Sequence, residues 1–162
     1  MINMIDLNLK IDKIILVIYD FDGVMTNNKV YLDKSGTEIV QVNRSDGLAI
    51  SEIKKLGIDQ IILSSEENEV VSKRAEKLKI DCLQAIKEKE ETLMDYCVSN
   101  GLDLKKVAYI GNDINDYKAM KLVAFPFCPS DANEDIKKIS LYVLKSKGGE
   151  GVVREFLDYV KS

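Results

Sequence analysis

Histidine and tryptophan are absent from this 162-residue chain, and proline occurs only twice. The lack of histidine excludes Ser-His-Asp and Cys-His mechanisms and every zinc site with a histidine ligand. Acid–base chemistry must therefore come from carboxylates, lysine, tyrosine or cysteine. The three cysteines, Cys82, Cys97 and Cys128, are widely spaced and show no CxxC pair. They are typical of small apolar side chains in a reducing, cytoplasmic compartment.

Long apolar runs and basic tracts are missing as well. No stretch approaches the length of a membrane span, so we expect no membrane partner. The segment 1–13 is too polar and acidic to predict a secretory signal. The net charge of −4 argues against a nucleic-acid partner. With 46% hydrophobic and 31% charged residues, the chain is expected to fold as one domain over residues 1–162.

Short apolar runs alternate with helical stretches along the chain. The expected strands cover 14–19, 60–63, 81–85, 107–110, 123–127 and 141–144. The expected helices cover 47–56, 67–78, 87–100, 115–122, 131–139 and 151–160, and a hairpin is expected over 30–42. Ser45 or Asp46 is the expected cap of the first helix. This alternation predicts an α/β fold with a doubly wound, mainly parallel sheet of the Rossmann-like type.

Polar side chains follow the predicted strands where each strand ends. Asp20 and Asp22 follow the first strand, and Ser64, Ser65 and Glu66 follow the second. The segment "GNDIND" (111–116) follows the fourth, and Lys89 lies near the start of the helix after the third. Ligands of such sheets bind beyond the carboxyl ends of the strands. These residues are therefore predicted to share one crevice.

The chemistry of this crevice suits Mg²⁺ and a phosphate, because Mg²⁺ prefers oxygen ligands and offsets repulsion between carboxylates. One of Asp20 and Asp22 can attack phosphorus while the other moves a proton. Ser64 can donate to a phosphoryl oxygen, and Lys89 can neutralise developing charge. Taken singly, each motif also has a plain structural interpretation, such as an acidic turn that caps a helix. Their joint placement favours a site.

The order of the polar motifs resembles that of the haloacid dehalogenase-like phosphatase superfamily. The motifs are "DFDGV", Ser64, Lys89 and "GNDIND". The resemblance extends over nearly the whole chain. It is closest to the capless subfamily of 3-deoxy-octulosonate 8-phosphate phosphatases and nonulosonate (sialic-acid-type) 9-phosphate phosphatases. Three segments carry this narrower match. The hairpin segment "KVYLDKSGTEIVQVNRSDGLAI" stands where other branches insert a cap domain, "SKRAEKL" follows the second motif, and "KSKGGEGVVREF" lies near the C-terminus.

The resemblance implies a role for each motif. Asp20 would form an aspartyl-phosphate, and Asp22 would act as general acid and then general base. Mg²⁺ would be held by the Asp20 carboxylate, the Asp22 carbonyl, and Asn112 or Asp113. Ser64 and Lys89 would grip the phosphoryl group, and Asp116 would order metal-bound waters.

The substrate is predicted from the residues after the second motif. Ser65 and Glu66, with Arg74 and Lys77, resemble the nonulosonate branch, in which the charged side chains contact the sugar acid. The alternatives are an octulosonate 8-phosphate substrate and, for Arg74 and Lys77, an ordinary charged helix face. The branch also resembles homotetramers in which hairpins meet at the centre and the segment "KSKGGEG" reaches a neighbouring site.

Three departures from the family pattern point to a rival hypothesis. Asn112 stands where the family usually has a metal-binding Asp, Asn27 and Asn28 replace an Asp-Gly pair, and the second motif lacks its glycine. These features also resemble the phosphatase-like domain of CMP-sialate synthetases, which implies a non-catalytic oligomerisation module. A third class, a phosphate-binding or signalling receiver, would need neither the hairpin nor "KSKGGEG". The joint presence of the four motif residues favours an enzyme.

Overall fold

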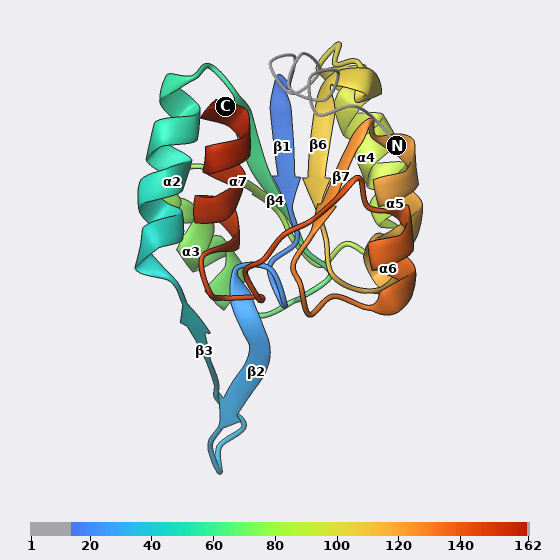
Figure 1. The fold of residues 1–162 in the computed structure, drawn as a ribbon. Helices are drawn as coiled ribbons and strands as arrows, with labels where there is room; N and C mark the ends of the chain where they lie inside the picture. The colour runs from blue at the N-terminus through green and yellow to red at the C-terminus, as the bar shows by residue number, and fades with distance from the viewer. Residues whose placement is uncertain (1–13, 162) are drawn as a thin grey trace.

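A six-stranded parallel sheet forms the centre of the molecule, in a computed structural model that describes residues 14–161 (Figure 1). Its order is β5-β4-β1-β6-β7-β8, and every neighbouring pair is parallel. The strands are β1 (Leu16–Tyr19), β4 (Asp59–Leu63), β5 (Asp81–Leu83), β6 (Val107–Ile110), β7 (Phe125–Cys128) and β8 (Tyr142–Val143). The predicted α/β class and parallel sheet are confirmed.

Helices cover both faces of the sheet and enclose two hydrophobic cores (Figure 1). One face carries α2 (Arg44–Lys55), α3 (Val70–Leu78) and α7 (Val152–Lys161). The other carries α4 (Lys89–Ser99), α5 (Tyr117–Leu122) and α6 (Glu134–Ile139). All four residues of β1 are buried, as expected for a central strand covered on both faces. The sheet therefore presents a fixed edge of strand ends to the loops that follow.

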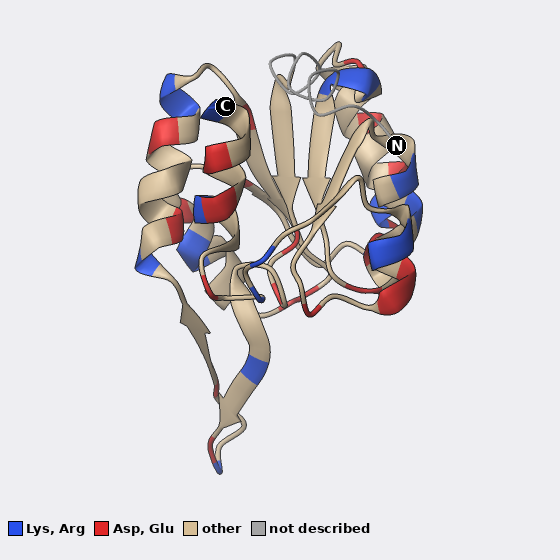
Figure 2. Cartoon of the chain, in the orientation of Figure 1, with Lys and Arg blue, Asp and Glu red and all other residues tan. Residues whose placement is uncertain are grey.

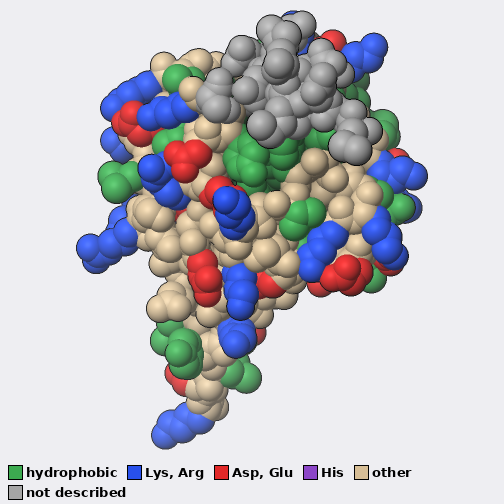
Figure 3. Space-filling model, in the orientation of Figure 1, with side chains coloured by type: hydrophobic (Ala, Val, Ile, Leu, Met, Phe, Trp, Pro, Cys, Tyr) green, Lys and Arg blue, Asp and Glu red, His purple; other side chains and the backbone are tan. Residues whose placement is uncertain are grey.

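An antiparallel hairpin of β2 (Thr26–Leu32) and β3 (Glu38–Val42) projects from the carboxyl-end side of the sheet (Figure 1). The predicted hairpin is confirmed, and β2 begins four residues earlier than expected. Hydrophobic side chains lie on the projecting part (Figure 3), where Tyr31 is 76% exposed and Leu32 is 66% exposed. Monomeric proteins rarely leave a continuous group of large apolar side chains exposed to solvent.

The predicted cap of the first helix is wrong. Asn43 is the N-cap of α2, because its side-chain oxygen accepts the Ser45 N–H at 2.9 Å. Ser45 and Asp46 lie inside the first turn, and Asp46 is buried instead of facing solvent. The helix accordingly begins three residues before the predicted start.

Two expectations concern the rest of the chain. Segment 1–13, which does not resemble a secretory signal, lies outside the described residues. Within residues 14–161, no helix has the length and apolar character required to cross a membrane.

Candidate active site

A polar cleft of about 230 Å³ lies beyond the carboxyl ends of β1, β4 and β6. Figure 2 shows acidic residues in the loops at this end of the sheet. The lining residues are Asp20, Asp22, Asn28, Ser64, Ser65, Glu66, Asn112, Asp113 and Asn115. The structure therefore brings most of the predicted site residues into one cleft.

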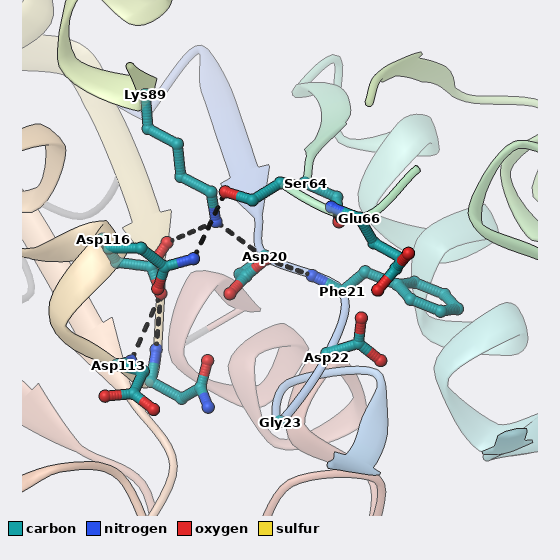
Figure 4. Close-up of polar contacts among 12 residues, drawn as sticks. Asp20, Phe21, Asp22, Gly23, Ser64, Glu66, Lys89, Asp113 and Asp116 are labelled. Carbon is teal, nitrogen blue, oxygen red and sulfur yellow. Dashed lines mark hydrogen bonds and ion pairs between the residues drawn. The ribbon is translucent and has the colours of Figure 1, made fainter. Parts of the chain in front are cut away.

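A buried ion cluster forms the floor of this cleft (Figure 4). The Lys89 ammonium lies 2.9 Å from Oδ1 of Asp20 and 2.7 Å from Oδ1 of Asp116. All three side chains are buried, with exposed fractions of 4%, 2% and 0% for Asp20, Lys89 and Asp116. Lys89 is the first residue of α4, so the helix fixes the ammonium behind the cleft. Buried charges are costly unless they are paired in this way.

Asp116 acts as the anchor of the cluster because it accepts four hydrogen bonds. The Lys89 ammonium and the Tyr109 hydroxyl donate to its Oδ1 at 2.7 and 2.8 Å, and the N–H groups of Asn112 and Asp113 donate to its Oδ2. Tyr109 was not predicted as a site residue, because a tyrosine within a buried strand reads as core. The four donors hold the "GNDIND" loop against Lys89.

The charges in the cluster shift the pKa values of both partners. Burial raises the pKa of Asp20 well above its usual value, and the Asp116 carboxylate raises it further, although Lys89 opposes both effects. Burial alone would lower the pKa of Lys89, but the two carboxylates outweigh it and the pKa rises. The raised pKa of Lys89 favours its charged form next to Asp20.

The turn after β1 directs Asp22 away from Asp20. Gly23 has a φ of 83° and lies so close to Asn112 that a Cβ would collide with the amide. The Thr26 hydroxyl donates to Asp22 Oδ1 at 3.3 Å. Burial raises the pKa of Asp22; the Thr26 hydrogen bond lowers it, and the carboxylates of Glu66 and Glu38 raise it. A half-buried carboxyl with a raised pKa suits a general acid.

Three groups at the centre of the cleft fit a divalent cation. One terminal atom of the Asn112 amide lies 2.9 Å from the Asp22 carbonyl oxygen and 3.1 Å from Asp20 Oδ2. If this atom is the amide nitrogen, it donates hydrogen bonds to both of these oxygens. If it is the amide oxygen, three oxygens, from Asn112, Asp22 and Asp20, converge on one point. Adjacent ligands of octahedral Mg²⁺ lie about 3 Å apart, as follows from Mg–O distances of about 2.0–2.1 Å. The donors therefore fit Mg²⁺.

The cation site differs from an all-carboxylate site. Within residues 14–161, no group of three His, Cys, Asp or Glu residues is arranged to hold a metal, so the site depends on an amide and a backbone carbonyl. Asp113 lies at the exposed rim of the cleft, where its carboxylate accepts the Ile114 N–H at 2.8 Å. Asn112 is thus better placed than Asp113 to face the cation.

The loop after β4 forms another wall of the cleft. Ser64 is 2% exposed, and its hydroxyl oxygen accepts the Glu66 N–H at 3.1 Å. Oε1 of Glu66 accepts the N–H of Glu67 and of Asn68. The Ser65 hydroxyl accepts from the Asn115 amide at 3.3 Å, which ties this loop to "GNDIND". The hydroxyl of Ser64 keeps its own hydrogen available for a ligand oxygen.

A second recess of about 240 Å³ continues from the cleft toward the hairpin. Its lining residues are Asp22, Asn28, Val30, Glu38, Val40, Glu66, Asn68 and Val70. Among the described residues, this lining contains carboxylates, amides and valines but no Lys or Arg. Glu38 was missed by sequence reasoning, because nothing in an alternating strand marks which charged residue faces a site.

Arg74 and Lys77 do not reach either recess. They line a separate basic hollow of about 580 Å³ with Arg44 and Lys79. The Arg74 guanidinium donates to the Asn43 carbonyl at 3.0 Å, at the start of α2. Contact between these two residues and the sugar acid stays a prediction.

A family comparison agrees with the geometry. The haloacid dehalogenase-like hydrolase family matches residues 9–156. The 3-deoxy-D-manno-octulosonate 8-phosphate phosphatase of Haemophilus influenzae is 31% identical, over 93% of this chain and 84% of that protein.

Two further relatives bear on the competing hypotheses. The N-acylneuraminate cytidylyltransferase A of Danio rerio is 29% identical over 90% of this chain, which spans only 34% of that protein. The crystal structure of the octulosonate 8-phosphate phosphatase of Moraxella catarrhalis, in complex with magnesium, phosphate and KDO, superposes with a TM-score of 0.93. It is 28% identical over 98% of this chain and 91% of that chain.

Proposed function

Because the chain belongs to the haloacid dehalogenase-like hydrolase family, we propose that it is a Mg²⁺-dependent phosphatase of a phosphorylated 2-keto-3-deoxy sugar acid. The observation that carries this proposal is the buried Asp20–Lys89–Asp116 cluster beside three converging polar groups. Burying three charges costs desolvation free energy that pairing only partly offsets, and such clusters in a cleft are typical of functional sites. A phosphoryl-transfer site is one such functional site.

The chain's own residues divide the reaction between them. Asp20 attacks phosphorus and forms an aspartyl-phosphate, while Asp22 donates a proton to the departing sugar oxygen. Asp22 then takes a proton from the water that hydrolyses the intermediate. Lys89 and Ser64 stabilise charge on the phosphoryl oxygens. Asp20, the Asp22 carbonyl and Asn112 would hold Mg²⁺, which would supply positive charge to neutralise the phosphate. Asp116 is fully buried and its carboxylate accepts four hydrogen bonds from the protein, so it positions Lys89, and its contact with metal-bound waters stays a prediction.

Within this class of substrates, we infer that the chain acts on a nonulosonate 9-phosphate. An octulosonate 8-phosphate is the alternative. Ser65 and Glu66 support the first, since Glu66 lines both the cleft and the adjoining recess and can accept from hydroxyl or amide groups. The relatives named as octulosonate 8-phosphate phosphatases support the second. Both substrates are sugar acids whose phosphate is the terminal ester.

The two substrates are distinguished by a phosphate-release assay with saturating Mg²⁺. We expect kcat/KM for the nonulosonate 9-phosphate to exceed that for the octulosonate 8-phosphate by about tenfold or more, the effect of roughly one charge-assisted hydrogen bond. The reverse preference overturns the choice of substrate. Release from neither substrate overturns the phosphatase itself.

The hairpin supports a homotetramer. Val30, Tyr31, Leu32 and Ile39 expose large apolar side chains on β2 and β3 (Figure 3), and contact with other copies would bury them. The hairpin lies next to the recess lined by Glu38, so assembly would also enclose the site. Free cysteines at 82, 97 and 128 are compatible with a cytoplasmic single-domain protein.

The oligomer is tested by light scattering on the purified protein. We expect a mass of four chains for the wild type and a smaller mass for the double variant Tyr31→Glu, Leu32→Glu, because two buried charges disrupt an apolar interface. Lys34→Glu, in the hairpin turn, is the matched control and is expected to remain tetrameric. A monomeric wild type contradicts this assembly.

The match to cytidylyltransferases favours a second candidate, a non-catalytic oligomerisation module associated with a CMP-sialate synthetase. Asn112 in place of a carboxylate supports this candidate. It predicts a tetramer that releases no phosphate from either substrate, so the two assays together separate it from the enzyme.

A further inference from the structure

The glycine-rich segment 145–151 lies against the catalytic loop of its own chain. The Gly149 N–H donates to the Val24 carbonyl at 3.0 Å. A Cβ on Gly148 would collide with the Gly23 carbonyl, and one on Gly149 would lie 2.6 Å from the Asn27 nitrogen. Backbone thus packs directly on backbone, and the segment supports the turn that aims Asp22.

The first turn of α7 holds this segment from the other side. Oε1 and Oε2 of Glu155 accept the N–H groups of Lys145 and Ser146 at 2.9 and 2.7 Å. The Asn43 side chain donates to the Gly149 carbonyl at 3.4 Å. The position of the segment therefore depends on where α7 begins.

Asp46 of α2 fixes that beginning. It is 2% exposed, and its Oδ1 accepts the Arg154 N–H at 3.1 Å. The N–H groups of a first helical turn have no partner within their own helix, and a carboxylate satisfies them and complements the helix dipole. α2 and α7 pack side by side (Figure 1), so Asp46 connects the two helices at the end nearest the site.

The second oxygen of the Asp46 carboxylate is left unsatisfied in the part of the chain that the structure describes. This Oδ2 and the Nε of Arg74 are both buried and have no hydrogen-bond partner within residues 14–161. The charged and titratable side chains facing Asp46 are Arg74 of α3 and Tyr19 of β1, and the backbone N–H groups of Val153 and Arg154 at the start of α7 also point toward it. Burial raises the pKa of Asp46 to about 6, although the N–H groups at the start of α7 and the Arg74 guanidinium lower it.

We propose that Asp46 is a positioning residue: through the first turn of α7 it holds segment 145–151 against the loop that carries Asp20 and Asp22. The role in catalysis rests on the proposed phosphatase function, whereas the contact itself does not. The ionised carboxylate holds the N–H groups of α7 more strongly than the neutral form.

Asp46→Ala and Asp46→Asn test this role, with Asp158→Asn as the matched control. Asp158 lies on α7 and is exposed, and it pairs with the guanidinium of Arg154 instead of its backbone N–H. In Asp46→Ala we expect the Gly149 amide to exchange its hydrogen about tenfold faster. We also expect kcat for the nonulosonate 9-phosphate to fall about tenfold with KM within about twofold, since a displaced catalytic group lowers kcat. Asp46→Asn keeps an acceptor oxygen and is expected to restore both losses at pH 5 but only part of them above about pH 6.

The pH dependence separates positioning from mere stability. The ratio of wild-type to Asp46→Asn kcat is expected to be close to one at pH 5 and to rise several-fold through about pH 6, because asparagine mimics only the neutral carboxyl. The ratio cancels the titration of groups common to both proteins, such as Asp22.

The outcomes are distinct. Unchanged Gly149 exchange in both Asp46 variants overturns the proposal, as does a flat kcat ratio across this pH range. If the wild type releases no phosphate but Gly149 exchange responds as expected, the proposed function fails and the positioning contact stands.

Discussion

Replacing Asp20 by asparagine is expected to abolish phosphate release while leaving the fold at least as stable as the wild type. An amide cannot form the acyl phosphate, so kcat should fall by a factor on the order of 10⁴ or more. The fold should persist because asparagine keeps an oxygen that accepts from Phe21 N–H and Lys89 Nζ, the two donors to Asp20 Oδ1.

The sign of the stability effect follows from the raised pKa of Asp20. A carboxyl whose folded-state pKa is raised contributes stability that is fully present below its unfolded-state pKa and is lost as the pH rises from there through the folded-state pKa. The asparagine variant lacks this loss, so its urea midpoint at neutral pH should equal or exceed that of the wild type. Asp135→Asn, an exposed surface change on α6, is the control and should alter neither quantity. Substantial activity in Asp20→Asn contradicts the assignment of the nucleophile.

Replacing Lys89 by methionine is expected to damage both stability and activity. Lys89 is 2% exposed and is the cation between Asp20 and Asp116, so its removal leaves two buried carboxylates facing each other. Breaking a buried ion pair from one side costs about 3–5 kcal/mol. Loss of the charge that faces the phosphoryl oxygens should also lower kcat about 10²–10³-fold.

Urea unfolding and phosphate release measure the two effects of Lys89→Met. Lys118→Met, an exposed lysine on α5, is the control and should change the free energy of unfolding by no more than about 0.5 kcal/mol. A Lys89→Met protein as stable as the control would mean that the two carboxylates do not depend on the ammonium. The Lys89 ammonium would then not be the charge that stabilises Asp20 and Asp116.

Local sequence patterns were sufficient to predict the sheet and the meeting of polar side chains in one cleft at the ends of its strands. The fully buried run of β1 followed by Asp20 marks both a central strand and the edge where ligands bind. Ser64 and Lys89 were found in the same way, because each follows a strand that the apolar pattern locates.

Contacts between distant helices could not be predicted in this way. Asp46 was expected to cap its own helix, but it instead accepts from Arg154 of α7, 108 residues away in sequence. Asn43 takes the cap because it lies just before the helical dihedrals begin. Tyr109 and Glu38 were missed for a related reason. Tyr109 donates to Asp116 of the "GNDIND" loop, and Glu38 lines a recess that it shares with residues far away in the sequence.

The contact of Arg74 with the sugar acid stays a prediction. It was implied by the resemblance to the nonulosonate branch, and within one chain Arg74 donates to Asn43 and lines a separate basic hollow. A single helix can present residues on different sides, and the pattern alone does not say which side faces the cleft.

The most direct test of the account is to identify the phosphorylated residue during turnover. Wild-type protein with Mg²⁺ would be quenched in acid after mixing with the nonulosonate 9-phosphate and, separately, the octulosonate 8-phosphate, and its peptides analysed by mass spectrometry. The account predicts a phosphoryl group on the peptide that contains Asp20, absent in Asp20→Asn. Phosphate release with the phosphoryl group on any other residue, or release at an undiminished rate by Asp20→Asn, would contradict it.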